Sequence, residues 1–267
     1  MSAALTAWVS GVGLLGPGLS DWPGAAQVLA GAAAYAPRPT VLPALECLPP
    51  AERRRTGRVV RLALSVGLEA TARAGADATR LPAVFSSSGG DGENCHEICQ
   101  ALAGPDRQIS PTRFHNSVHN AASGYWGIAT GATAASNALC AYDASFAAGL
   151  LETLVQLTIE ETAVLLIAYD VGYPEPLRSA RPIPDAFAVA LLLTPSPRQE
   201  SMAQLTAFLS AAPAELLSDP QLEALRAQVP AARSLPLLRR LARREGAAVV
   251  VDYLERQSLS IEVSPCH

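Results

Sequence analysis

Two hydrophobic periodicities alternate along this chain. Between Arg58 and Ala74 the apolar residues recur at the spacing of one helical face, and Gly75 ends the run. The apolar positions are Val59, Leu62, Ala63, Val66 and Ala70. In contrast, Ala163 to Tyr169 and Ala186 to Thr194 are continuous apolar runs, as expected of strands buried on both faces. The alternation predicts an α/β protein.

Shorter runs extend this order toward the N-terminus. Ala7 to Val12 predicts a first buried strand that a Gly/Pro turn closes. Ala83 to Ser87 predicts a second strand, which leads into a Gly-rich loop. A helix is expected over Asn94 to Leu102, so the middle of the chain has the rhythm of strand, loop and helix.

The last quarter of the chain has a different composition. From Met202 to about Arg244 the sequence is rich in Ala, Leu and Arg with interspersed prolines, and it predicts a helical stretch. Ala247 to Tyr253 and Leu259 to Val263 are apolar runs that predict two strands. We expect these strands to form a terminal hairpin or to extend the sheet.

Composition narrows the class of protein. The chain has 267 residues, of which 49% are hydrophobic and 16% charged, so it can bury a substantial core. Its 20 basic and 24 acidic side chains leave a net charge of −4, which argues against nucleic acid as a partner. The N-terminal apolar run has no basic residue before it and is interrupted by glycines. We therefore expect no signal peptide, no membrane span and a cytoplasmic protein.

Two motifs have simpler interpretations than they first suggest. Gly11-Val12-Gly13-Leu14-Leu15-Gly16 satisfies the dinucleotide-binding pattern, but Pro17 and Gly18 follow where a helix should open, so a turn is expected. Cys95, His96 and Cys99 are three soft ligands without a second pair, so an ordinary helix is expected rather than a zinc site. The five cysteines are an odd, scattered set, which favours reduced thiols. We expect no metal and no cofactor.

The stretch from Ser110 to Glu152 carries the most chemistry. It begins with Phe114-His115-Asn116-Ser117-Val118-His119-Asn120 and continues through Ser136-Asn137-Ala138-Leu139-Cys140. It ends in the small-residue run Phe146-Ala147-Ala148-Gly149-Leu150-Leu151-Glu152. This pattern resembles the nucleophile region of the β-ketoacyl synthases. It looks most like the short, chain-length-factor-like subunits of bacterial aryl polyene and related type II polyketide systems.

The resemblance implies a fold and a division of the chain. The expected fold is thiolase-like, half of a ketosynthase, with α/β/α layers around a mixed central sheet. Residues 1–195 would form the ketosynthase-like domain. Residues 196–267 would form a helical and β C-terminal extension packed on the same core.

The position that matches the family nucleophile is open between two residues. Aligning Ser136-Asn137-Ala138 with the family's Ser-x-Ala places it on Leu139, whereas a shift of one places it on Cys140. Ketosynthases also need two histidines from their C-terminal half, and this chain has none between His119 and His267. The resemblance therefore implies a subunit with no catalytic residue of its own. The alternative is an acyltransferase or thioesterase in which His119 activates Cys140.

The resemblance also implies partners. As a silent subunit, the chain would form a heterodimer with a catalytic ketosynthase and shape its acyl tunnel; a pure scaffold is the other possibility. The interface and tunnel residues would be Phe114, His115, Asn116, Val118, His119, Tyr125, Trp126 and Phe146. The basic run Arg53, Arg54, Arg55 and Arg58 would dock an acidic acyl carrier protein, unless it is only a solvated helix face.

Overall fold

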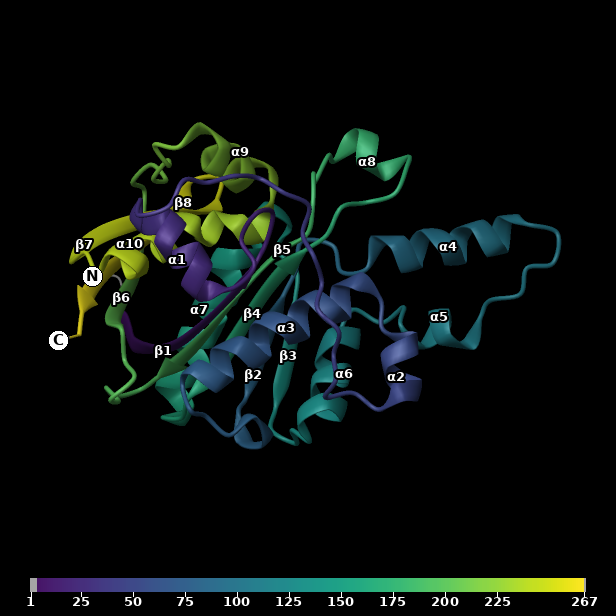
Figure 1. Ribbon diagram of the computed structural model, residues 1–267, viewed down its shortest axis with the longest axis horizontal. Helices are drawn as coiled ribbons and strands as arrows, with labels where there is room; N and C mark the ends of the chain where they lie inside the picture. Colours follow the sequence, from purple (N-terminus) through teal and green to yellow (C-terminus); the bar gives the residue numbers. More distant parts are fainter. Residues whose placement is uncertain (1–3, 267) are drawn as a thin grey trace.

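The computed structural model describes residues 4–266, and its centre is one eight-stranded sheet (Figure 1). The strand order is β3-β2-β4-β5-β1-β6-β8-β7. The strands are β1 (Leu5–Leu15), β2 (Ala83–Ser86), β3 (Ser136–Leu139), β4 (Val164–Asp170), β5 (Phe187–Thr194), β6 (Ala203–Ser210), β7 (Ala247–Leu254) and β8 (Gln257–Pro265). Strands β2, β3 and β4 are parallel, and the other pairings are antiparallel, so the sheet is mixed as expected.

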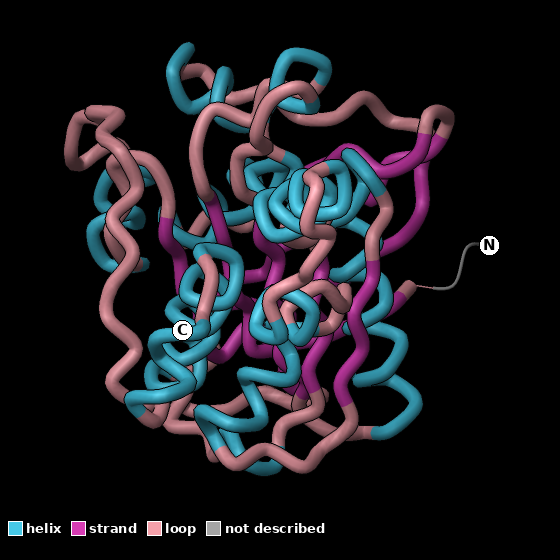
Figure 2. Tube along the Cα trace, turned by 90° about the vertical axis from the view of Figure 1, so that its right-hand side faces the viewer, coloured by secondary structure: helices cyan, strands magenta, loops and turns pink. Residues whose placement is uncertain are grey.

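Helices cover both faces of the sheet, so the strands lie in the interior (Figure 2). The α-helices are α1 (Trp22–Ala30), α2 (Pro50–Arg55), α3 (Arg58–Arg73), α4 (Gly92–Ala103), α5 (Pro111–His115), α6 (Ala121–Thr130), α7 (Ser145–Glu160), α8 (Leu177–Ala180), α9 (Pro220–Gln228) and α10 (Leu235–Arg243). Three short 3₁₀ helices are η1 (Ala78–Arg80), η2 (Tyr142–Ala144) and η3 (Pro230–Ser234).

The alternation of side chains along β4 divides the core into two clusters. Val164 and Leu166 belong to the cluster that contains α7, α1 and α10, whereas Leu165 and Ile167 belong to the cluster that contains α3 and α6. All four side chains are fully buried, because a strand with helices on both faces has no solvated side. The continuous apolar runs predicted as β4 and β5 are thereby confirmed, as are helix α3, strand β2 and helix α4.

The glycine motif near the N-terminus lies inside a strand. Gly11 and Gly13 are part of β1, and a Cβ added at either would overlap a carbonyl oxygen of α3, that of Ala70 or Val66. The predicted end of the strand at Val12 is therefore too early. The turn comes later, where the amide of Gly16 donates to the carbonyl of Leu19 at 2.8 Å. The glycines serve the close packing of a helix on a strand and form no phosphate-binding loop.

The segment after residue 195 continues the sheet. The prediction of a helix from Met202 is wrong at its start, because residues 203–210 form β6 between β1 and β8. Its buried residues, Ala203, Leu205 and Ala207, alternate with half-buried ones, which is the period of a strand. The predicted hairpin of β7 and β8 is confirmed and joins the sheet through β6. The division of the chain at residue 195 stays a prediction.

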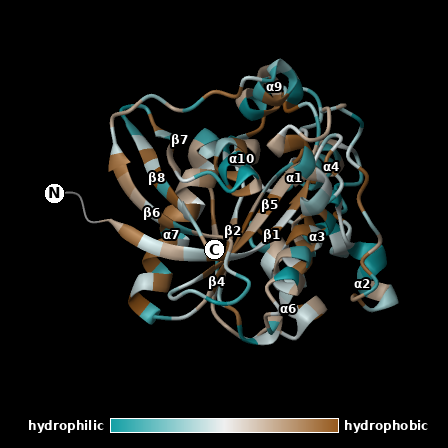
Figure 3. Ribbon diagram, turned by 60° about the vertical axis from the view of Figure 1, so that its left-hand side comes forward, coloured by the Kyte–Doolittle hydropathy of each residue, from teal (hydrophilic) through white to brown (hydrophobic). Residues whose placement is uncertain are grey.

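The segments around helices α4 and α5 have the least contact with the central sheet. Helix α4, helix α5 and the loop between them extend away from the sheet, and we call residues 92–115 the α4–α5 arm (Figure 1). The arginine-rich helix α2 lies nearby and is hydrophilic, in contrast to the strands (Figure 3). Within residues 4–266, no helix is both long and apolar enough to cross a membrane.

Candidate functional site

The turn between β3 and α7 contains Leu139 and Cys140, the two residues predicted to match the position of the family nucleophile. Leu139 ends β3, Cys140 follows it, and the chain then passes through η2 into α7. The Ser145 hydroxyl closes this turn, since it accepts from the Ala141 amide at 3.1 Å and donates to the Tyr142 carbonyl at 2.7 Å. Tyr142 has a φ of 52°, a left-handed conformation that non-glycine residues seldom adopt. The turn is thus tightly defined.

Cys140 is exposed, and no basic side chain in residues 4–266 forms a hydrogen bond with it. Its Sγ lies 3.1 Å from the Ser88 carbonyl oxygen, so the thiol acts as a hydrogen-bond donor. His119 borders the same loop, because a Cβ on Gly90 would lie 3.1 Å from the His119 Nδ1 atom. No hydrogen bond joins Cys140 to a histidine in residues 4–266. The geometry brings the two residues of the proposed dyad to one loop without forming the dyad.

Two charged side chains hold this turn against neighbouring loops. The Arg181 guanidinium lies 3.7 Å from the centroid of the Tyr142 ring and donates to Asp143 at 2.6 Å. Arg233, in η3, forms a second ion pair with Asp143 at 3.2 Å. Asp143 therefore connects the turn to the segment after β4 and to η3. None of these contacts was visible from the sequence, since Asp143 and Arg233 are far apart in the chain.

A buried carboxylate lies at the end of β4. Asp170 accepts the Ser88 amide and the Ala231 amide, each at 2.8 Å. It is almost completely buried, and burial raises its pKa to about 6, although these hydrogen bonds oppose the rise. The carboxylate thus ties the loop after β2 to η3, across the core.

The predicted interface residues of the α4–α5 arm and its continuation divide by exposure. Phe114 and Val118 are 69% and 54% exposed, and His115 and His119 are exposed as well. Asn116 is buried, where its Nδ2 donates to the Arg55 carbonyl at 2.8 Å. Asn116 therefore bonds backbone within this chain, and its place at an interface stays a prediction.

The predicted aromatic residues of α6 and α7 are core residues of this chain. Tyr125 is buried, and its hydroxyl donates to Asn116 Oδ1 at 3.1 Å. Trp126 packs against Gly67 of α3, and Phe146 is buried on the opposite face of the sheet. A role for these three in a partner's tunnel stays a prediction. Phe114 and Val118 are the apolar members of the predicted set that can contact a partner without any change in the core.

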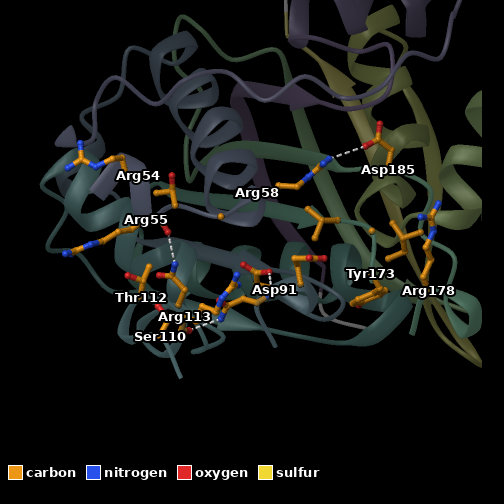
Figure 4. Close-up of a pocket in the computed structure, with 18 of the residues that line it drawn as sticks. Arg54, Arg55, Arg58, Asp91, Ser110, Thr112, Arg113, Tyr173, Arg178 and Asp185 are labelled. Atoms are coloured by element: carbon orange, nitrogen blue, oxygen red, sulfur yellow. Dashed lines mark hydrogen bonds and ion pairs between the residues drawn. The ribbon is translucent and has the colours of Figure 1, made fainter. Parts of the chain in front are cut away.

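The basic run lies beside a cleft of about 830 Å³ (Figure 4). Five arginines line it: Arg54, Arg55, Arg58, Arg113 and Arg178. Three acidic residues line it as well: Asp91, Glu93 and Asp185. The lining therefore has an excess of two positive charges in a protein of net charge −4. Arg53 lies outside it and donates to the Leu48 carbonyl at 3.2 Å.

Sequence reasoning found only part of this cleft. Arg113 comes from α5 and pairs with Glu97 at 3.0 Å, and Arg178 comes from α8. Both are distant in sequence from α2, and no local pattern marks them. The cysteines of α4 show no metal geometry, since no group of three or more metal-binding side chains exists among residues 4–266.

The β3 end of the sheet is an open edge. β3 pairs only with β2, and the carbonyls of Ala135 and Leu139 accept amides of residues 83 and 87. Because backbone groups alternate in direction along a strand, the amides and carbonyls of Ser136 and Ala138 point outward. The Asn137 side chain turns toward α7, where its Nδ2 donates to Glu152 Oε1 at 3.0 Å.

Comparisons with known proteins agree with this architecture. Residues 22–254 match the family model described as beta-ketoacyl synthase, N-terminal domain, a match that extends past residue 195. No curated protein sequence matches the chain. The structure is similar to a chain of the complex of ketosynthase ApeO with its chain length factor ApeC from Xenorhabdus doucetiae. That similarity has 25% identity and a TM-score of 0.74, over 97% of this chain and 99% of the other.

Two further solved structures share the fold at lower identity. The ishigamide ketosynthase/chain length factor gives a TM-score of 0.71 at 14% identity, over 98% of this chain and 100% of the other. The type II polyketide synthase complex AntDE:AntF gives 0.74 at 12% identity, over 99% and 100%. The thiolase-like, mixed-sheet fold expected from the sequence is thereby confirmed. With most of its length matched by the family model, the chain belongs to the β-ketoacyl synthase family, N-terminal domain.

Proposed function

We propose that this chain is a catalytically silent subunit, similar to a chain length factor, in polyene, polyketide or fatty-acid-like biosynthesis. It forms a heterodimer with an active β-ketoacyl synthase and shapes the tunnel that holds the growing acyl chain. The observation that carries the proposal is that Cys140 forms no hydrogen bond with a histidine in residues 4–266; its thiol bonds the Ser88 carbonyl instead. The similarity to the complex of ApeO with its chain length factor ApeC supports the same reading.

The chemistry of condensation explains why this missing hydrogen bond matters. A ketosynthase needs a thiolate nucleophile and donors that stabilise the developing oxyanion. Here the Cys140 thiol donates to the Ser88 carbonyl. His96 and His115 lie on the α4–α5 arm, and His119 makes no hydrogen bond to Cys140. Among the described residues, no histidine is therefore hydrogen-bonded to this thiol.

Exposed features on one side of the chain support a protein partner. The outward backbone groups of β3 can pair with a strand of another subunit, which would extend the sheet. Phe114 and Val118 place apolar side chains in solvent on the segment that precedes α6 in the sequence. Large exposed apolar side chains are typical of an interface.

The arginine-lined cleft supports a carrier-protein partner. Acyl carrier proteins are acidic, and the cleft combines five guanidinium groups with the hydroxyls of Ser110 and Thr112 (Figure 4). Arg54 and Arg178 form no ion pair with any described residue, so their charges are available to an acidic surface. Such docking is electrostatic and weakens with salt.

Co-expression with a catalytic β-ketoacyl synthase from the same organism tests the proposal. Light scattering of the purified species should give the mass of a one-to-one complex, and the chain alone should be poorly soluble. A well-behaved monomer or homodimer that does not bind the ketosynthase would overturn the proposal. Reconstitution with carrier protein then shows whether the complex makes product.

Trimming an exposed side chain tests the tunnel separately. Phe114→Ala should change the length distribution of the acyl product at a normal yield of complex, because Phe114 can reach a partner without disturbing the core. Leu177→Ala is the matched control, since Leu177 is an exposed apolar residue on α8. An unchanged length distribution in both variants would favour a scaffold that does not shape the tunnel.

A further inference from the structure

Helix α7 has a second, outward face beside the open edge. Phe146, Leu150, Leu154 and Leu157 point into the core. Glu152, Val155, Gln156 and Ile159 follow at the i, i+3, i+4, i+7 spacing of one stripe. Ile159 is 75% exposed, so the stripe is open to solvent.

A hydrogen-bonded carboxylate joins this stripe to β3. The side-chain amides of Asn137 and Gln156 both donate to Glu152 Oε1, at 3.0 and 2.8 Å. The second oxygen, Oε2, receives no donor from the described residues, and Glu152 forms no ion pair with them. The carboxylate is therefore held in place with one oxygen uncommitted, at the boundary between the helix and the edge strand.

No cation lies nearby in the sequence to neutralise this charge. Residues 120–177 contain no Lys, Arg or His. The Glu152 carboxylate thus borders the open edge with no positive charge from its own segment.

Self-pairing through β3 would place like charges together. A two-fold interface brings the same patch of both copies face to face. If two β3 strands paired antiparallel about such an axis, the helices α7 of both copies would lie on one side of the extended sheet. The two Glu152 carboxylates, each fixed beside its own Asn137, would then approach one another near the axis. Like charges in such a position disfavour the homodimer.

We infer that Glu152 selects the heterodimer over the homodimer, and that the partner presents a basic side chain, Lys or Arg, to Glu152 Oε2 beside β3. The inference rests on the proposed heterodimer and adds the chemistry that the partner must supply at this point. Repulsion excludes a second copy of this chain, while a cation on the ketosynthase converts the same carboxylate into an attractive contact.

The test compares Glu152→Gln with the unmodified chain, both in complex with the ketosynthase. The Gln variant keeps the size of the side chain and removes the charge. It should weaken the heterodimer about five- to tenfold and lower the salt dependence of its dissociation constant between about 50 mM and 500 mM salt. By sedimentation, the isolated variant should self-associate more strongly than the unmodified chain.

The matched control is Glu255→Gln, which removes one charge in the turn between β7 and β8, at the other end of the sheet. It should leave both measurements unchanged.

If Glu152→Gln and the unmodified chain bind the ketosynthase equally, with equal salt dependence, the inference is wrong although the heterodimer stands. If the unmodified chain does not bind the ketosynthase at all, the proposed function itself fails. The salt dependence of the unmodified complex is a further measurement that needs no folded variant, and a flat dependence would also count against the inference.

Discussion

The two edges of the sheet differ in how they end. At the β7 edge, the Glu215 amide donates to the Val250 carbonyl at 2.8 Å, so the chain's own segment pairs with the strand at this one residue. Arg239 and Arg240 bind the Glu215 carboxylate and hold that segment in place. At the β3 edge nothing in the described chain pairs with the outward groups. This difference supports the proposal that a partner subunit pairs with β3.

One proline substitution at each edge of the sheet tests most directly whether the partner binds at β3. Ala138→Pro removes an outward amide at the open edge and should weaken the heterodimer at least a thousandfold, about 4 kcal/mol, because strand pairing across the interface is lost. The isolated chain should lose less than about 1 kcal/mol of stability, since that amide has no internal partner. Binding is measured by titration with the purified ketosynthase.

The matched control is Ala248→Pro. Ala248 also points its amide outward, but on β7, because Val250 two residues later accepts from outside the strand pair. This variant should bind the ketosynthase normally. Equal loss of binding in the two variants would show that the partner does not use the β3 edge.

Asp170 links the loop after β2 to η3, so its protonation should change the stability of the folded chain. Because burial raises its pKa from 3.8 to about 6, the folded chain keeps a proton that the unfolded chain has released between about pH 4 and pH 6. Its contribution to stability is therefore full below about pH 4 and is lost as pH rises through 6, by about 3 kcal/mol. Urea unfolding of Asp170→Asn should lack this decline. Parallel pH profiles for the two proteins would contradict the assignment.

Removing the Glu215 side chain beside the β7 edge should have a smaller effect, on stability alone. Glu215→Ala leaves the mostly buried Arg239 without its carboxylate, while Arg240 keeps its ion pair with Glu245, and should lower the free energy of unfolding by about 2 kcal/mol. The binding of the ketosynthase should not change. Glu262→Ala, an exposed acidic residue on β8, is the control. A loss as large in the control would mean that the ion pairs at the edge contribute little.

The smallest expected effect is that of Cys140→Ala. If the thiol has no role in catalysis, the complex with this variant should make normal product within about twofold. Cys95→Ala on the α4–α5 arm controls for the loss of an exposed thiol. Abolished product with Cys140→Ala alone would revive the acyltransferase or thioesterase alternative.

Much of the central sheet could be predicted because its signals are local. The apolar run at residues 163–169 needs no knowledge of its neighbours to indicate a strand buried on both faces. β6 was missed because Ala and Leu favour helices, and their preference outweighed the alternation of buried residues at 203, 205 and 207. Gly11 and Gly13 looked like a loop because the helix that requires them, α3, lies some fifty residues later.

The candidate site was less predictable because its contacts are not local. Sequence similarity identified the stretch that contains Cys140, but not the Ser88 carbonyl that its thiol meets. The link of Asp170 to both Ser88 and Ala231 joins residues 82 and 61 positions away. Five arginines converge on the cleft from α2, α3, α5 and α8, and only the three near α2 form a run in sequence.

The open strand β3 has a consequence for the supply of this protein in the cell. An unpaired strand is a template for any other exposed strand, so a surplus of this subunit is exposed to aggregation until it meets its partner. β3 is only four residues long and is bordered by Glu152, and both features limit that hazard. Matched synthesis of the two subunits would remove it, and the recovered amount of this chain should then follow the amount of ketosynthase made with it.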